Sequence, residues 1–266
     1  MNLLPKKNAF VLLSTDVGSM IVNKNDYWRN NDGIYGVGHQ LFETSMYDND
    51  EINLGYKILQ LYSQIRGSGI VAIDCGANIG VNTISWGRFM MGWGSLYAFE
   101  AQERIFYALA GNVALNNLFN VKVTWAAVSD SPGILEIPII NYLQPSSFGS
   151  VEIEKLKVTE DIGQQLNYES GRGQIIPKTS VDSMGFSRLD FLKIDVEGME
   201  LKVLNGARNT IMNFKPCIFI EKIKNNQDEL FKYLVDLDYI PHDFGNNYVC
   251  FHSEEDEWII KKLNNK

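Results

Sequence analysis

The chain has 266 residues, of which 45% are hydrophobic and 21% charged, which suits one large globular domain with a full core. Its formal net charge is −8 and it has no block of lysines and arginines, so we exclude a surface that follows nucleic-acid phosphates. No apolar run is long enough for a membrane-spanning helix, and three cysteines without CxxC spacing exclude a disulfide scaffold and a structural zinc site. We expect a cytoplasmic protein with buried thiols.

Residues 1–48 are predicted to form an ordered N-terminal extension or lid. The start, MNLLPKKNAFVLLS, is read as a strand because it lacks the apolar core and cleavage site of a signal peptide. The segment GIYGVGHQLFE is read as a loop that carries His39, whose imidazole a lid could bring to an active site. An ordered extension of this kind also leaves a homo-oligomer open.

Residues 49–266 are predicted to form the main domain, because apolar runs alternate there with segments of helical periodicity. We expect a helix over 49–66, a strand over 70–74, a helix through Phe89, a strand over 95–100, a further helix, and a strand over 121–128. The strand IVAID is apolar without alternation, which is typical of a strand buried on both faces. The pattern indicates βαβ units in a doubly wound, mostly parallel sheet.

Residues from about 131 to 185 interrupt this rhythm and are read as an insertion of hairpins over the edge or mouth of the sheet. It contains ILEIPII, a second strand pair, and the segment 141–150, expected to be a mobile loop facing the cofactor. The rhythm then resumes, with the strand LDFLKID, one helix through Ile211, the strand CIFIE, another helix, and a late antiparallel strand in an edge hairpin, YVCFH.

The turn CGANIG follows the first strand of the domain and begins a helix, which is the arrangement of a nucleotide-type cofactor site. Gly76 and Gly80 allow the backbone to turn sharply and to approach a ligand. The spacing is not the G-x-G-x-x-G that binds pyrophosphate, and Asp74 would repel that group. A carboxylate there suits the ammonium and sulfonium of S-adenosylmethionine, and Glu100, at the end of the next strand, can accept hydrogen bonds from both ribose hydroxyls.

The runs VAIDCGANIGVNT, AFEAQERIFYALAGNVALNN, WAAVSD, LDFLKIDVEGMELKVLNGA and KPCIFIE resemble the FkbM family of methyltransferases over about residues 70–250. The resemblance implies a class I methyltransferase fold with a seven-stranded sheet, S-adenosylmethionine as methyl donor, and O-methylation of a hydroxyl on a sugar, glycan or small natural product. Carried over by position, it implies that the cofactor is held by Asp74, Gly76, Ala77, Asn78, Gly80, Asn82, Thr83, Glu100, Ala101, Ala127, Val128 and Asp195.

The candidate catalytic residues lie at the ends of two later strands. Asp195 and Glu221 each end a strand, Glu197 follows in the turn, and Lys193 points to the same side as Asp195. Either Asp195 or Glu197 acts as a general base, or Asp195 and Glu221 hold a divalent cation. We favour the base without a metal. Glu197 could instead interact with the dipole of the helix that follows.

Two other functions stay open at this point. A nucleotide-dependent oxidoreductase is disfavoured by the absent G-x-G-x-x-G, and a catalytically silent binding or partner subunit is disfavoured by the intact cofactor residues. The acceptor itself is not readable, because the segments expected to shape its pocket carry no motif.

Overall fold

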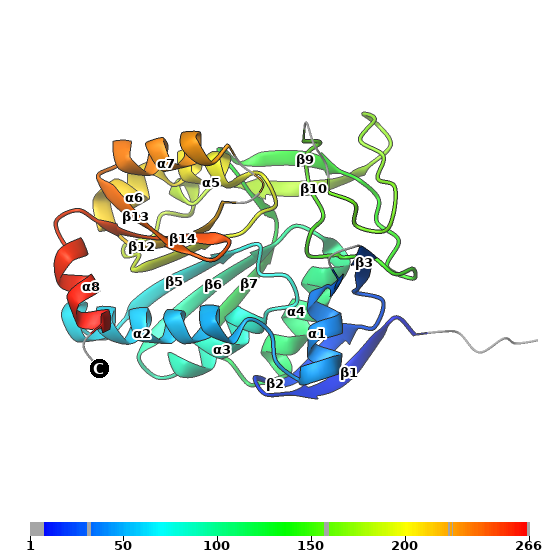
Figure 1. Cartoon of the computed structure of the whole chain (residues 1–266), viewed down its shortest axis with the longest axis horizontal. Coiled ribbons are helices and arrows are strands. Elements are labelled where there is room, and N and C mark those ends of the chain that lie inside the picture. Colours follow the sequence, from blue (N-terminus) through cyan, green and yellow to red (C-terminus); the bar gives the residue numbers. More distant parts are fainter. Residues whose placement is uncertain (1–7, 31–32, 157–159, 223, 225, 265–266) are drawn as a thin grey trace, which may run out of the picture.

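A seven-stranded sheet forms the centre of the fold in the computed structural model of the chain (Figure 1). The structure describes residues 8–30, 33–156, 160–222, 224 and 226–264. The strand order is β13-β14-β12-β11-β5-β6-β7; β14 is antiparallel to both its neighbours and the other pairs are parallel. The strands are β5 (Ile70–Cys75), β6 (Gly94–Glu100), β7 (Val121–Trp125), β11 (Phe191–Ile194), β12 (Cys217–Glu221), β13 (Tyr239–Phe244) and β14 (Asn247–His252). The predicted doubly wound sheet is confirmed, and the late antiparallel strand lies one place in from the edge.

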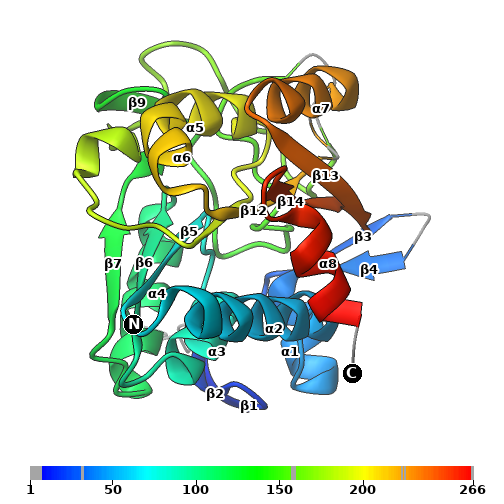
Figure 2. The ribbon, with the colours of Figure 1, turned by 90° about the vertical axis from the view of Figure 1, so that its left-hand side faces the viewer.

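Helices cover both faces of the sheet (Figures 1 and 2). One layer contains α2 (Asn49–Arg66), α3 (Val81–Phe89) and α4 (Glu103–Leu115), and the other contains α5 (Glu200–Gly206), α6 (Arg208–Phe214) and α7 (Gln227–Asp236). A final helix, α8 (Asp256–Asn264), packs beside β14. The single helix predicted through Ile211 is wrong: the helix breaks at Ala207, so α5 and α6 are separate.

Alternation along the buried strands divides the core into two layers. In β5, Ala72 packs toward α2 and α3, whereas Ile73 packs toward α5 and α7. In β11, Phe191 and Leu192 divide in the same way. Every residue of β11 is buried, which is why its sequence shows no polar alternation. The chain order reverses between β5 and β11, and this places a ligand crevice beyond the carboxyl ends of those two strands.

The N-terminal segment packs beside the C-terminal half of α4. Strands β1 (Phe10–Thr15) and β2 (Gly18–Asn23) form a hairpin, and Asn112 of α4 accepts a hydrogen bond from the backbone N–H of Ile21 and donates to its carbonyl. The strand predicted within MNLLPKKNAFVLLS is confirmed in its described part as β1, and residues 1–7 of that prediction lie outside the described residues. A second pair, β3 (Trp28–Asn30) and β4 (Gly33–Tyr35), leads into helix α1 (Val37–Thr44).

Helix α1 corrects the interpretation of GIYGVGHQLFE as a loop. The buried carboxylate of Asp26 accepts a hydrogen bond from the Gly38 N–H at 2.9 Å, and the carbonyl of Asp26 accepts one from the His39 N–H at 2.9 Å. These bonds satisfy backbone donors in the first turn of α1. Asp26, which caps this helix, lies outside the segment, so the sequence of the segment alone does not indicate the helix.

The insertion contains one strand pair in its described part. Strands β9 (Gly133–Ile137) and β10 (Gln174–Thr179) are antiparallel, and β10 also pairs with β8 (Ala127–Val128). The strand read in ILEIPII is confirmed as β9, but the hairpins are wrong: its partner is β10 and not a strand directly after 141–150, and the described residues within 138–173 form no helix or strand. Val151 and Ile153 are buried, yet Glu152 between them is buried too, so the side chains do not alternate between a core face and solvent.

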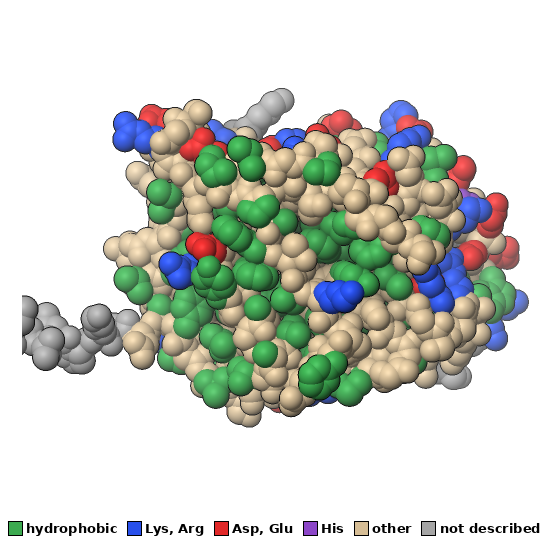
Figure 3. All heavy atoms as spheres, turned by 180° about the vertical axis from the view of Figure 1, so that it is seen from behind, with side chains coloured by type: hydrophobic (Ala, Val, Ile, Leu, Met, Phe, Trp, Pro, Cys, Tyr) green, Lys and Arg blue, Asp and Glu red, His purple; other side chains and the backbone are tan. Residues whose placement is uncertain are grey.

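The buried and exposed side chains agree with the expectations from the composition. The three cysteines are buried thiols in the sheet, at positions 75, 217 and 250. Within the described ranges, no helix combines the length and the apolar character needed to cross a bilayer. The face opposite to that of Figure 1 carries hydrophobic side chains across its middle, and its Lys and Arg side chains do not join into a continuous patch (Figure 3).

Candidate functional site

The glycine turn between β5 and α3 shapes the floor of the site. Gly76, Asn78 and Gly80 have positive φ angles of 79°, 51° and 93°. A Cβ atom on Gly76 would collide with the carbonyl oxygen of Asp195, so glycine is required where the turn passes the end of β11. Asn78 is not a glycine, so its positive φ angle strains the backbone at this turn.

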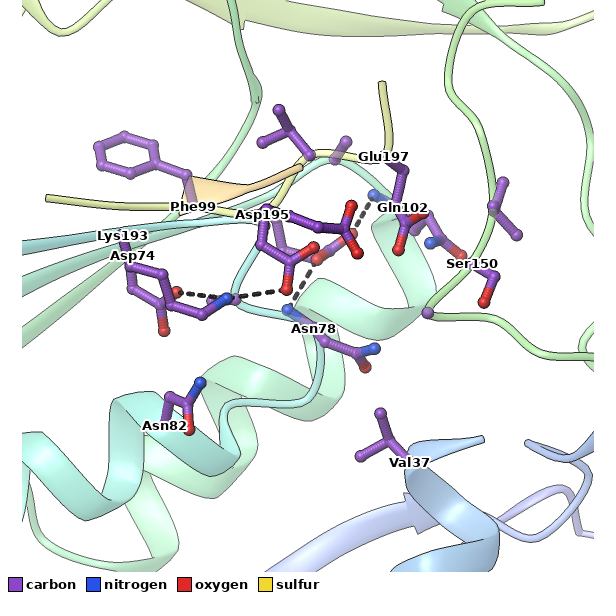
Figure 4. A pocket seen from close by; sticks show the side chains of 18 of the residues that line it. Val37, Asp74, Asn78, Asn82, Phe99, Gln102, Ser150, Lys193, Asp195 and Glu197 are labelled. Atoms are coloured by element: carbon purple, nitrogen blue, oxygen red, sulfur yellow. Dashed lines mark hydrogen bonds and ion pairs between the residues drawn. The ribbon is translucent and has the colours of Figure 1, made fainter. Parts of the chain in front are cut away.

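A cavity of about 320 Å³ opens above this turn, at the carboxyl ends of β5, β6, β11 and β12 (Figure 4). Its volume falls in the range of small-molecule pockets. The predicted site residues that line it are Asp74, Gly76, Ala77, Asn78, Asn82, Glu100, Ala101, Ala127, Val128, Lys193, Asp195, Glu197 and Glu221. Gly80, Thr83 and His39 lie outside the lining: Gly80 directly precedes α3, Thr83 donates a hydrogen bond to the lining residue Asp74, and His39 lies on α1 near the lining residue Val37.

Glu100 ends β6 as a fully buried carboxylate with both oxygens oriented by backbone. Oε2 accepts a hydrogen bond from the Asn78 N–H at 2.9 Å, and Oε1 accepts one from the Gln102 N–H at 2.8 Å. Burial raises the pKa of Glu100 to about 7, although these backbone bonds act in the opposite direction. Each oxygen keeps a second lone pair, so the carboxylate can accept two further hydrogen bonds from a ligand diol.

A buried lysine joins the carboxylates at the centre of the sheet. The Nζ of Lys193 lies 2.9 Å from Asp195 Oδ2, 3.8 Å from Glu51 Oε1 and 3.9 Å from Asp74 Oδ1. Burial disfavours the ammonium, but Asp195, Glu51 and Asp74 outweigh that effect and raise the pKa of Lys193. The lysine is therefore a fixed positive charge behind the cavity.

Two oxygen atoms near this lysine have no hydrogen-bond donor. Asp74 Oδ2 accepts from the Thr83 hydroxyl at 2.6 Å, but its buried Oδ1 accepts none. The Asn82 amide donates to Glu51 Oε1 at 2.7 Å, and its own Oδ1 is also without a donor. Buried acceptors in this state call for a donor-rich ligand group, and the ammonium of S-adenosylmethionine meets that need.

Asp195, Glu197 and Glu221 form a carboxylate trio beside the cavity. One oxygen from each lies within 4.8 Å of the others. Glu197 adopts a φ of 56° and forms an ion pair with Lys224. Burial and the charge of Asp195 raise the pKa of Glu197, to about 8, against the opposing effect of Lys224, and burial with the charges of Asp195 and Glu197 raises that of Glu221 to about 10. The trio can therefore share protons, and its oxygen set is also one that a divalent cation accepts.

The carboxylate that bonds to the backbone ahead of α5 is Glu200, not Glu197. Its Oε1 accepts hydrogen bonds from the N–H groups of Val196 at 3.0 Å and Gly198 at 3.2 Å. Glu197 lines the cavity instead. The backbone bonds at the start of this helix are thus made by Glu200, and a role for Glu197 in the site stays a prediction.

Several site residues were not predicted from the sequence. Glu51 reaches Lys193 from α2, and Lys224 reaches Glu197 from the turn after β12. Gln102 donates to the Phe148 carbonyl at 2.8 Å, which connects the end of β6 to the insertion. The sequence does not single out Glu51, because acidic residues are common in the first turn of a helix. Lys224 follows the strand-ending Glu221 by three residues, and no motif in the sequence singles it out.

The segment 141–150 lies at the cavity, as predicted. Ser147, Gly149 and Ser150 line it. Part of the segment is fixed by buried hydrogen bonds: Ser146 donates from its hydroxyl to the Ile162 carbonyl at 2.7 Å, and the Phe148 N–H donates to Asp26 at 3.0 Å. The predicted mobility of this loop stays a prediction.

Comparison with known proteins relates the chain to methyltransferases. The profile described as "Methyltransferase FkbM domain" matches residues 74–247. The curated protein "Methyltransferase sdnD" of Sordaria araneosa is 30% identical over 155 residues, which cover 51% of this chain and 59% of that protein. Among solved structures, methyltransferase FkbM from Methylobacillus flagellatus KT has a TM-score of 0.47 and 19% sequence identity, and its alignment covers 74% of this chain. A methyltransferase from Geobacter sulfurreducens has a TM-score of 0.43 and 12% sequence identity, and its alignment covers 77% of this chain. The alignments span 48% and 80% of those two chains.

Proposed function

The chain belongs to the FkbM family of S-adenosylmethionine-dependent methyltransferases, and on that premise we propose that it methylates a hydroxyl group of a glycan or small-molecule acceptor. The observation that carries the proposal is the meeting of three carboxylates, Asp195, Glu197 and Glu221, at the same cavity as Glu100 and Asp74. One end of the cavity suits the cofactor, and the other offers proton acceptors.

The residues present fit the cofactor. Glu100 offers two acceptor oxygens to the ribose hydroxyls, and Asp74 Oδ1 and Asn82 Oδ1, which accept no hydrogen bond from the described residues, can accept from the amino-acid end. Ala101, Ala127 and Val128 offer a small apolar surface for the adenine. When bound, the cofactor supplies a methyl group already activated by its sulfonium, so the protein has to align the acceptor and exclude water.

Asp195 is the proposed proton acceptor. Lys193 holds its Oδ2 at 2.9 Å, which fixes the carboxylate and leaves Oδ1 for the acceptor hydroxyl. Its side chain is 34% exposed, more than those of its partners Lys193 and Glu197, so it is open to a substrate. A hydroxyl that loses its proton to Asp195 becomes the nucleophile. Glu197, paired with Lys224, is the second candidate for this role.

Proton sharing is favoured over a metal within the trio. Glu221 Oε2 is buried without a hydrogen-bond donor, and the raised pKa of Glu221 makes this carboxyl neutral near pH 7. A neutral third member relieves the repulsion among the carboxylates without a cation. The lysines Lys193 and Lys224 already balance the other two members.

The test measures methyl transfer from labelled S-adenosylmethionine to a panel of hydroxyl acceptors, with cofactor affinity measured separately by calorimetry. We expect cofactor binding, and label in an alkali-stable methyl ether. Cofactor binding without transfer to any hydroxyl, or transfer to nitrogen or carbon only, would contradict O-methylation. Failure to bind the cofactor would favour a silent subunit.

A further inference from the structure

A second cavity, of about 620 Å³, lies in the insertion next to the cofactor cavity. Ser150 lines both cavities. In the close-up, Ser150 lies on the loop that faces Glu197 and Gln102 (Figure 4). The two cavities therefore meet at Ser150, on the side of the cofactor cavity where Glu197 lies.

Lys224 links the two cavities. Its Nζ donates to the Ser150 carbonyl at 2.8 Å, lies 3.1 Å from Glu160 Oε2, and forms an ion pair with Glu197. The Glu160 N–H in turn donates to Glu152 Oε1 at 3.0 Å. A chain of contacts thus runs from the proposed catalytic trio to the interior of the second cavity.

Two polar atoms of the second cavity are buried and unpaired. Glu152 is 4% exposed, and its Oε1 is held by Glu160 while its Oε2 has no donor. Gln164 accepts from the Asn141 N–H at 3.0 Å through Oε1, while its Nε2 has no acceptor. Each side chain is thus held in place by one polar atom, with the other left for a partner. Buried polar atoms normally have partners, so a ligand that supplies one donor and one acceptor is indicated.

The charge of the cavity narrows the class of ligand. Glu152, Glu160, Asp161 and Glu169 line it, against Lys155. This acidic lining disfavours phosphate and carboxylate groups by repulsion. Its other polar side chains are amides, a phenol and the Ser150 hydroxyl, which bond to uncharged groups in both directions.

We propose that this second cavity, where Glu152 Oε2 and Gln164 Nε2 are unpaired, binds the acceptor and takes a neutral polyhydroxylated group, a glycosyl unit. One hydroxyl of such a unit donates to Glu152 Oε2 and another accepts from Gln164 Nε2. The inference rests on the proposed methyl transfer, because it holds the acceptor beside Asp195 and Glu197. It adds the residues that select the acceptor.

The test uses the full chain saturated with S-adenosylhomocysteine. Saturation-transfer NMR titrates the methyl glycosides of glucose, galactose, mannose, rhamnose and fucose, with glucose 6-phosphate and glucuronate as anionic probes. Two near-isosteric variants each invert one unpaired atom: Glu152→Gln changes an acceptor to a donor, and Gln164→Glu does the reverse. Glu154→Gln is the matched control, because Glu154 pairs with Lys202 and is not among the lining residues.

We expect at least one neutral glycoside to bind, and both variants to weaken its binding by about tenfold or more, as for loss of a hydrogen bond to a buried polar group. Affinity for S-adenosylhomocysteine and binding by Glu154→Gln should match the wild type. Binding of none of the neutral glycosides, preferred binding of the anionic probes, or unchanged glycoside affinity in folded variants overturns the proposal. Loss of the cofactor site appears separately, as loss of S-adenosylhomocysteine binding.

Discussion

Replacement of Glu100 by glutamine probes the cofactor site most directly. The two carboxylate oxygens each accept one backbone N–H, from Asn78 and Gln102. A glutamine keeps only one of these acceptors and places its NH₂ against the other N–H. If the ribose hydroxyls bond to the carboxylate, the loss costs about 1.5–3 kcal/mol for a bond to a charged group, or roughly 10- to 150-fold in Kd.

The pH dependence of binding gives the same prediction a second measurement. With a pKa of about 7, Glu100 is largely protonated at pH 6 and ionised at pH 8. Because the ionised form accepts both hydroxyls, the Kd for S-adenosylmethionine should rise by about tenfold from pH 8 to pH 6. Glu100→Gln should remove this dependence.

The raised pKa of Glu100 also makes the free energy of unfolding depend on pH. A folded-state pKa of about 7, above the ordinary 4.5, means that the folded chain binds this proton more tightly than the unfolded chain. The contribution is therefore favourable at low pH and is lost as the pH rises from about 4.5 to 7, by up to about 3 kcal/mol. The unfolding free energy of Glu100→Gln should change less with pH over that window than that of the wild type.

Calorimetry at pH 6, 7 and 8 gives the affinities, and urea unfolding gives the stabilities. Glu229→Gln is the control, because Glu229 is exposed on α7. Glu100→Ala should weaken binding at pH 8 by a similar amount. An unchanged Kd in a correctly folded Glu100 variant would refute the ribose assignment, and a Kd independent of pH in the wild type would refute its ionisation near pH 7.

Three further predictions concern the carboxylates and their lysine. Asp195→Asn should keep cofactor affinity and lower turnover by about 10²–10⁴, as for loss of a general base; full turnover would make Asp195 structural and direct attention to Glu197. Lys193→Met leaves buried carboxylates without their cation and should lower the unfolding free energy by about 3–5 kcal/mol in urea, whereas the exposed control Lys57→Met should not; equal stabilities would contradict the buried ion cluster. Glu221→Gln resembles the neutral carboxyl that the raised pKa of Glu221 favours, so turnover at pH 7 should change only a few-fold. EDTA should have little effect on the activity of the wild type. Activity that is lost in EDTA and restored by magnesium or manganese would assign a metal to the trio.

Residues at strand ends could be predicted because their position follows from local pattern. The apolar run of β5 and its glycine turn identify Asp74, and the run of β11 identifies Asp195. Helix α2 begins and ends as predicted, at Asn49 and Arg66, because Asp48 accepts from the Glu51 N–H at its start and Gly67 follows its end. In each case the residues that predict the element lie within a few positions of the element itself.

Residues that depend on packing between distant segments could not be predicted. Asp26 caps α1 and fixes Phe148, a residue 122 positions away in the sequence. Glu51 meets Lys193 across the layer between α2 and the sheet. The described residues of 138–173 include side-chain to backbone bonds of this kind, so periodicity in the sequence does not describe their conformation. The acceptor side of the site consequently had to come from the structure.

The carboxylate lining of the cavity suits the charge changes of the proposed reaction. Methyl transfer to a hydroxyl removes one positive charge from sulfur and releases one proton. Asp74, Glu100, Asp195, Glu197 and Glu221 line the cavity with Lys193, so a cation is favoured before transfer. The released proton is taken up by the Asp195 carboxylate, which lies beside Lys193. The net charge of the cavity then stays the same across the step, which avoids leaving an additional unbalanced charge in a buried site.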